Sequence, residues 1–101
     1  MTNPESLRRD LEDKLKKFTF HGQSIPSRMQ PSLVNYLVDH QPVGSFLRCV
    51  ISNDLYWSVA HADDENVNLL PVYISFLYNE APSSSWGSPE AYSNWINEAK
   101  S

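Results

Sequence analysis

Hydrophobic residues recur every three or four positions along most of the chain, which is the spacing of an α-helix rather than a β-strand. Glycine, proline and short polar runs interrupt this spacing, and each interruption separates two predicted helices. We therefore predict an all-α fold, a compact bundle of about five short helices joined by short loops. The predicted helices span residues 3–18, 31–40, 45–62, 67–81 and 88–100.

The first predicted helix differs from the others because most of its residues are charged. Asn3 and Pro4 are typical of a helix start, and a narrow hydrophobic stripe follows at helical spacing. We expect residues 1–18 to form a peripheral charged helix on a core of residues 25–100, so that residues 1–101 make one domain. The stripe consists of Leu7, Leu11, Leu15 and Phe18.

The most hydrophobic segment, residues 67–81, contains the run "VYISFLY", which alone would also suit a buried strand. We predict a helix because the neighbouring segments are helical and no second strand is available for pairing. Pro71 must then lie in the first turn of this helix or kink it, because proline lacks the N–H that a helix interior needs.

The stretch "GSFLRCVISNDLYWSVAHADDEN", residues 44–66, places polar residues beside a hydrophobic stripe. On one continuous helix, Asp54, Ser58 and His61 would form a polar ridge against the core, which needs a ligand or hydrogen bonds to satisfy it. Alternatively the chain turns at Asn53 and Asp54, and these residues cap helices. We favour caps because Asn and Asp are preferred there. The core-facing stripe is Leu47, Val50, Ile51 and Leu55.

Composition restricts the classes of partner. The chain has 101 residues, of which 41% are hydrophobic, and a net charge of −4. An acidic chain is poorly suited to bind nucleic acid directly, so a basic protein surface is the better electrostatic match. No hydrophobic run is long enough for a membrane span. A single cysteine cannot form an internal disulfide, which favours a cytoplasmic location.

The sequence contains no recognisable catalytic pattern. Cys49 lies among hydrophobic residues, as a buried unreactive thiol would. With only three glycines, the chain has no glycine-rich phosphate loop. His61, Asp63 and Asp64 match no standard metal spacing, and we favour a helix junction capped by Asp63 or Asp64. We therefore expect no enzyme, no metal and no cofactor.

Aromatic and basic residues supply the candidate binding positions. Aromatic residues make up 12% of the chain, more than a small core needs. Trp86 lies in a loop, where it either plugs the end of the bundle, which we favour, or forms an exposed anchor. Arg28 and Arg48 are candidates for holding an anion. The candidate partner- or ligand-binding residues are Arg28, Arg48, Asn53, Asp54, His61, Asp63, Asp64, Trp86 and Tyr92.

Residues 25–97 contain the ordered patterns "GSFL", "NDL", "ADDEN" and "WGS" followed by a final Trp. With "IPSRM", "LVNYL" and "FLYNEAP", these patterns resemble a family of small proteins encoded in bacteriophages and prophages. The resemblance covers about three-quarters of the chain and omits the first helix. It implies a phage setting and no catalytic residues. Pro71 departs from the uninterrupted helix that the resemblance leads us to expect.

Three functions are compatible with a small acidic phage protein in the host cytoplasm. The first is an anti-defence protein, for example an anti-CRISPR, that binds and inhibits a host antiviral protein or complex. The second is a homo-oligomer that sequesters a nucleotide-type immune signal. The third is a phage structural or regulatory adaptor. We favour the first, because acidic charge and surplus aromatics suit a protein interface.

Overall fold

The structure is a computed structural model that describes residues 4–98, which form six α-helices and no β-strand. The prediction of an all-α bundle is confirmed. One more helix is present than expected, because the predicted helix 45–62 is divided into two. The α-helices are α1 (Pro4–Lys17), α2 (Gln30–Asp39), α3 (Ser45–Ile51), α4 (Leu55–His61), α5 (Leu70–Glu80) and α6 (Pro89–Asn97), and the 3₁₀ helices are η1 (Ser27–Met29), η2 (Asn66–Leu69) and η3 (Ser83–Ser85).

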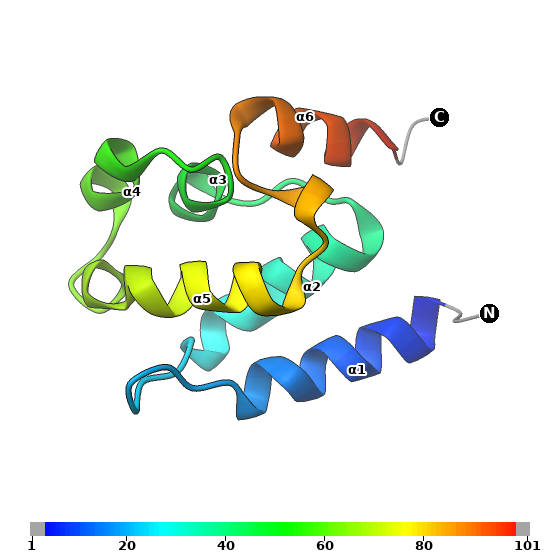
Figure 1. Ribbon diagram of the computed structural model, residues 1–101, viewed down its shortest axis with the longest axis horizontal. Helices are drawn as coiled ribbons and strands as arrows, with labels where there is room; N and C mark the ends of the chain where they lie inside the picture. The colour runs from blue at the N-terminus through cyan, green and yellow to red at the C-terminus, as the bar shows by residue number, and fades with distance from the viewer. Residues whose placement is uncertain (1–3, 99–101) are drawn as a thin grey trace.

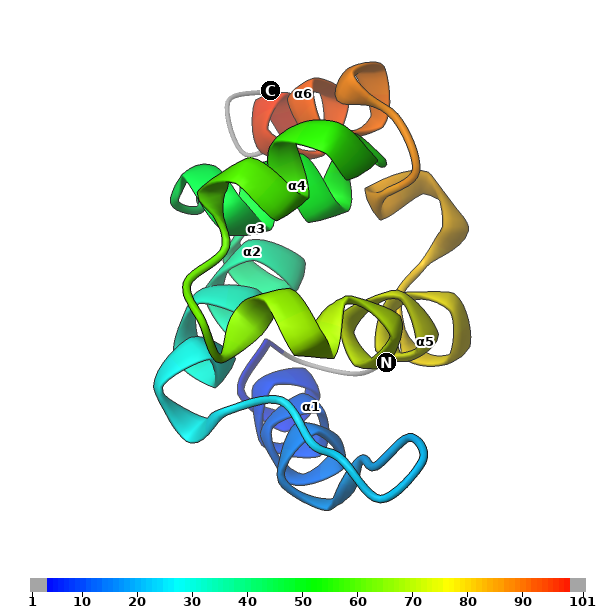
Figure 2. The same ribbon diagram turned by 90° about the vertical axis from the view of Figure 1, so that its left-hand side faces the viewer.

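The helices form three layers. α2 and α5 cross the middle of the molecule, α1 lies below them, and α3, α4 and α6 lie above them (Figure 1). The view from the side shows the same order and places α4 on the outside of the upper layer (Figure 2). The middle layer is therefore covered on both sides, whereas α4 has one side open to solvent.

Proline and serine residues set where several helices begin. Three helices have a proline in their first turn, where a missing N–H costs no helical hydrogen bond. These are Pro31 in α2, Pro71 in α5 and Pro89 in α6. Pro71 thus starts α5 rather than kinking it, and the "VYISFLY" run is helical as predicted. Ser88 caps α6, and its hydroxyl accepts a 3.0 Å hydrogen bond from the Ala91 N–H.

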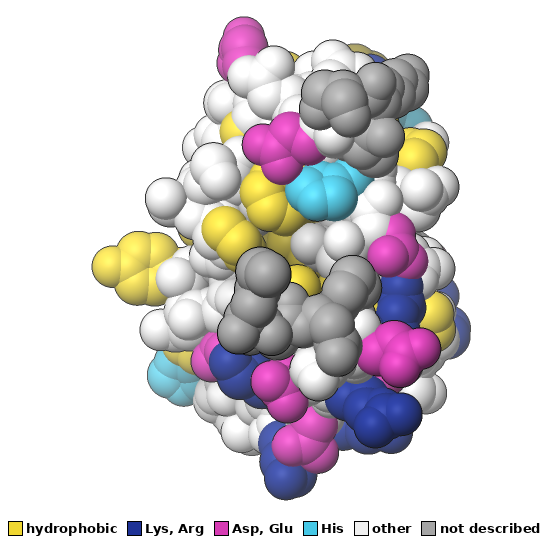
Figure 3. Space-filling model, turned by 90° about the vertical axis from the view of Figure 1, so that its right-hand side faces the viewer, with side chains coloured by type: hydrophobic (Ala, Val, Ile, Leu, Met, Phe, Trp, Pro, Cys, Tyr) yellow, Lys and Arg dark blue, Asp and Glu magenta, His cyan; other side chains and the backbone are white. Residues whose placement is uncertain are grey.

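The helix α1 lies on the core through a narrow stripe, as expected. Leu11 and Leu15 are buried. The remaining surface of α1 is charged, and Lys14 and Lys17 pair with Glu80 and Asp13 at 3.2 and 3.1 Å. Figure 3 shows basic and acidic side chains gathered over the lower part of the molecule, where α1 lies. The core itself comes from α2, α3 and α5, with Leu33, Val34, Tyr36, Leu37, Phe46, Leu47, Val50, Ile51, Val72, Tyr73, Phe76 and Leu77 buried.

Three hydrogen bonds, two of them buried and one partly buried, connect different elements of the fold. The Tyr36 hydroxyl donates to the Ser85 carbonyl at 2.6 Å, and the Trp95 indole N–H donates to the Tyr36 carbonyl at 2.8 Å. The Tyr73 hydroxyl donates to Asn66 Oδ1 at 2.7 Å. Within residues 4–98, every buried side-chain nitrogen and oxygen has a hydrogen-bond partner. The polar groups of this small core are therefore satisfied, as a stable interior requires.

The Tyr73–Asn66 bond gives a first prediction. Asn66→Ala leaves the Tyr73 hydroxyl buried without its acceptor, so we expect the free energy of unfolding to fall by about 2 kcal/mol. Tyr73→Phe removes the donor. Because the two residues form one bond, the double variant should lose less stability than the sum of the single variants. Urea denaturation of the four proteins measures this coupling, and strict additivity would contradict it.

Candidate functional site

The turn between α3 and α4 decides how α4 is placed. Asn53 adopts a left-handed backbone conformation, with φ of 62°. Its N–H donates to the Val50 carbonyl at 3.1 Å, and the Asp54 N–H donates to the Cys49 carbonyl at 2.9 Å. This is the hydrogen-bond pattern by which a left-handed residue ends a helix. Asp54 then caps α4, and its carboxylate accepts a 3.2 Å hydrogen bond from the Trp57 N–H.

The expectation that the chain turns at Asn53 and Asp54 is thus confirmed, and the alternative of one continuous helix is wrong. Ser58 is buried, and its hydroxyl donates to the Asp54 carbonyl at 2.6 Å. His61, one turn further on, is exposed. The three residues therefore do not form a polar ridge against the core, because the turn at Asn53 rotates α4 away from the axis of α3.

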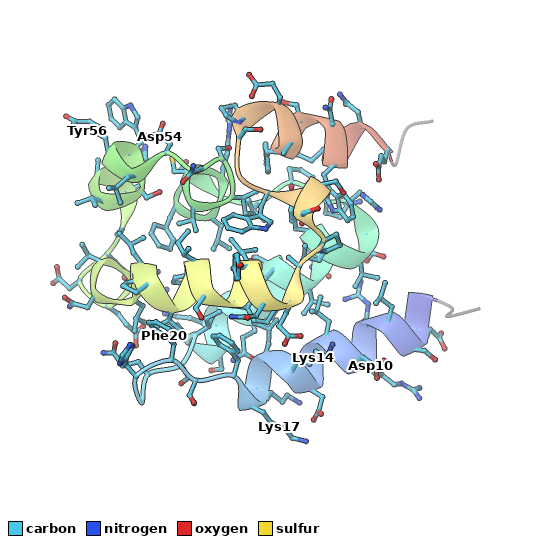
Figure 4. The ribbon with its side chains drawn as sticks, viewed as in Figure 1. Asp10, Lys14, Lys17, Phe20, Asp54 and Tyr56 are labelled. Atoms are coloured by element: carbon cyan, nitrogen blue, oxygen red, sulfur yellow. The ribbon has the colours of Figure 1, made fainter. Side chains whose placement is uncertain are left out.

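The turn also exposes hydrophobic residues that the sequence pattern placed in the core. Leu55, predicted to continue the core-facing stripe, is 70% exposed, and that prediction is wrong. Tyr56 is 74% exposed and points away from the body of the molecule (Figure 4). Trp57 and Val59 are 51% and 46% exposed. A seven-residue helix thus presents four large hydrophobic side chains to solvent.

One flank of α4 continues onto α5. Leu55 and Ile74 line the same shallow groove, whose floor includes Val50 and Leu70. Ile74 is partly exposed, and Tyr78, one helical turn further along α5, is 75% exposed. Figure 2 shows α4 and α5 on the same side of the molecule. We call this surface the α4–α5 apolar face, and it consists of Leu55, Tyr56, Val59, Ile74 and Tyr78.

The opposite flank of α4 borders a polar groove of about 310 Å³ between α3, α4 and α6. Four of the predicted site residues meet there, namely Arg48, Asp54, His61 and Tyr92. The sequence pattern did not identify Trp57 as a fifth member, because its position is set by the turn. We call this the α3–α6 groove, and its lining is completed by Ser45, Cys49, Ser52, Pro89 and Ser93.

The electrostatics of the α3–α6 groove depend on Arg48, Tyr92 and Cys49. The Arg48 guanidinium lies over the Tyr92 ring, 5.8 Å from its centroid, and makes no ion pair within residues 4–98. Tyr92 itself is buried, with its ring stacked on Tyr36 at 5.5 Å. Burial, and then the nearby Asp54 charge, raises the pKa of the Cys49 thiol, so this cysteine is a poor nucleophile at neutral pH.

Arg28 and Asp63 are also brought together, in a second groove that His61 lines as well. The Arg28 guanidinium pairs with Asp63 at 2.7 Å and with Glu65 at 2.8 Å. Asp63 Oδ1 accepts a 2.7 Å hydrogen bond from the Asn66 N–H, so Asp63 caps the junction before η2 as expected. This bond, and then Arg28, holds the pKa of Asp63 below its ordinary value. Asp64 stays exposed and does not line this groove.

Trp86 packs partly buried against the core. The next residue, Gly87, donates its N–H to the Ile51 carbonyl at 2.7 Å, which holds this loop on α3. This packing favours a structural role for Trp86 over that of an exposed anchor.

No grouping of three or more His, Cys, Asp or Glu side chains suitable for a metal ion occurs among residues 4–98. In the same range, none of the helices has the length and hydrophobicity needed to cross a membrane. Comparisons with protein-family models, with curated proteins and with solved structures gave no match.

The left-handed turn gives a second prediction. Asn53→Ala replaces a residue whose short polar side chain tolerates the left-handed conformation with one that does not, and we expect the free energy of unfolding to fall by about 1 kcal/mol. Asn53→Gly should change it by less than about 0.5 kcal/mol, because glycine adopts this conformation freely. Thermal and urea unfolding measure the difference. Equal destabilisation by both substitutions would show that the Asn53 side chain, rather than its backbone conformation, is what matters.

The lowered pKa of Asp63 gives a third prediction. Because its pKa is lower in the folded state, the carboxylate stabilises the fold above the ordinary aspartate pKa, and this stabilisation disappears as the pH falls through the folded-state value. Asp63→Asn should therefore reduce the free energy of unfolding at about pH 7 and have less effect at about pH 2.5. Asp64→Asn is the control. Urea unfolding at both pH values tests this, and a pH-independent effect of Asp63→Asn would contradict it.

Proposed function

We propose that this protein is a non-catalytic protein-binding module that docks on its partner through the α4–α5 apolar face. In the phage setting that the resemblance implies, the partner is a host antiviral defence protein or complex, such as a CRISPR–Cas effector, and binding inhibits it. The observation that carries the proposal is the exposure of Leu55, Tyr56 and Tyr78, each at least 70% open to solvent.

The exposed side chains have the properties of interface residues. Tyrosine combines a large apolar surface with a polar hydroxyl and loses little conformational entropy on binding, so it is frequent among residues that dominate binding energy. Tyr56 and Tyr78 are exposed on α4 and α5, and Leu55 and Ile74 from the same two helices line one groove. Exposed large apolar side chains that gather on two neighbouring helices are typical of a protein interaction site.

The local structure holds this face in a fixed orientation. The Asn53 turn and the Asp54 cap define the start of α4, and buried Ser58 anchors its inner side. A surface that is ordered before binding loses less entropy when the complex forms. We infer that the face is presented as a preformed docking element rather than one that folds on its partner.

Charge around the face indicates the chemistry of the partner. Asp54 lies at the start of α4, and the exposed Asp64 follows shortly after its end. Together with the net charge of −4, this acidic surround favours a partner whose apolar pocket has a basic rim. Proteins that bind nucleic acid carry such basic surfaces, and nucleic-acid-guided defence effectors belong to this class.

The proposal predicts that Tyr56→Ser/Val59→Ser weakens partner binding at least tenfold, or about 1.4 kcal/mol, while the thermal midpoint stays close to that of the parent. Leu7→Ser is a matched control, because Leu7 on α1 is 45% exposed, about as much as Val59. Affinity purification from infected cells, followed by mass spectrometry, should recover a defence component with the parent and the control but not with the double variant.

A phage plating assay tests inhibition directly. In cells carrying the recovered defence system, the parent and Leu7→Ser should restore phage plating, whereas Tyr56→Ser/Val59→Ser should not. The purification could instead recover a virion or phage transcription component with the parent but not with the double variant. That result would support the docking face but contradict the anti-defence role. A concentration-dependent dimer abolished by the double variant would assign the face to a second copy and contradict the proposal.

A further inference from the structure

We propose that the α3–α6 groove is a binding site for a mononucleotide, with Arg48 and His61 holding the phosphate and Trp57 stacking on the base. This site lies on the flank of α4 opposite the α4–α5 apolar face. The inference does not depend on the protein-docking function, because none of the five residues of that face lines this groove, and only Tyr56 of the five has its ring against Trp57, at 5.0 Å.

The first argument is the charge of Arg48. Two other arginines are already neutralised locally, since Arg8 pairs with Asp39 and Arg28 pairs with two carboxylates, whereas Arg9 lies on the charged surface of α1 and lines no part of this groove. Arg48 lies instead over the Tyr92 ring and has no carboxylate partner within residues 4–98. Its guanidinium therefore keeps its donors for an anion, and phosphate is one of the anions, with carboxylate, that arginine binds in bidentate fashion.

The second argument is the arrangement of Trp57 and His61. They lie one turn apart on α4, and their rings are 5.9 Å apart at an angle of 33°. Trp57 is half-exposed, so part of its indole surface is open to the groove. An exposed tryptophan that shares a groove with Arg48 suits a ligand with both a flat ring and a negative charge. The His61 imidazole adds a second nitrogen donor for the same anion.

The third argument is the remaining lining of the groove. Hydroxyls of Ser45, Ser52 and Ser93 offer donors and acceptors for phosphate and sugar oxygens. The Asp54 carboxylate repels a bare anion but accepts hydrogen bonds from ribose hydroxyls, which inorganic phosphate does not have. The groove volume of about 310 Å³ lies at the lower end of small-molecule pockets, roughly 300–1,000 Å³, and so suits one nucleotide rather than a longer chain.

The test is a nuclear magnetic resonance titration of the ¹⁵N-labelled protein with AMP, GMP, CMP and UMP separately. We expect at least one nucleotide to shift the signals of Trp57 and Arg48 in a saturable manner at millimolar concentrations. Arg48→Gln should weaken that binding by about tenfold or more, because it removes a charged donor. Arg28→Gln is the matched control and should leave the affinity within about twofold, since its guanidinium pairs with carboxylates outside this groove.

Two further ligands separate the contributions of base and phosphate. Adenosine and inorganic phosphate should each bind more weakly than AMP, and Trp57→Ala should weaken AMP binding more than Trp57→Phe, which keeps an aromatic surface. Absence of saturable shifts with all four nucleotides would overturn the proposal. Equal affinity of AMP for the parent and Arg48→Gln, or equal affinity of AMP and inorganic phosphate for the parent, would also overturn it.

Discussion

The left-handed backbone of Asn53 determines the position of every candidate functional residue on α4. It ends α3 after two turns and lets Asp54 start a new helix in a different direction. Without this turn, Leu55 would continue the buried stripe of α3. With it, one side of α4 is held against the core at Ser58, and the remaining surface is open. A single backbone conformation thus converts hydrophobic residues of a predicted core into an exposed surface.

The two flanks of α4 differ in chemistry because neighbouring helices differ. Toward α5, Leu55 lies near Leu70 and Ile74, and the surface is apolar. Toward α3 and α6, Trp57 and His61 share a groove with Arg48, and the surface is polar and contains an unpaired cation. Apolar surface is suited to a protein partner, whereas an unpaired arginine beside an aromatic ring is suited to an anion. The short helix therefore separates two kinds of binding surface.

The fold was largely predictable from local sequence chemistry. Helical spacing, first-turn prolines and caps such as Ser88 act within a few residues, so they identify the helix starts without knowledge of the tertiary structure. The same holds for Asp63, which caps its own junction as expected. The position of Leu55 was not predictable from spacing alone, because a three-residue turn changes the helix axis and not the spacing of hydrophobic residues along the chain.

The sequence by itself determined an all-α bundle, a charged α1 on its surface and caps at Asn53 and Asp54, because these depend on local spacing and backbone preference. Only the tertiary structure decided which candidate side chains retain free binding capacity. Arg28 and Arg48 are equivalent in the sequence, yet carboxylates distant in sequence neutralise the first, and an aromatic ring lies beneath the second. Long-range packing makes that distinction, because it determines which charges lie within contact distance of one another.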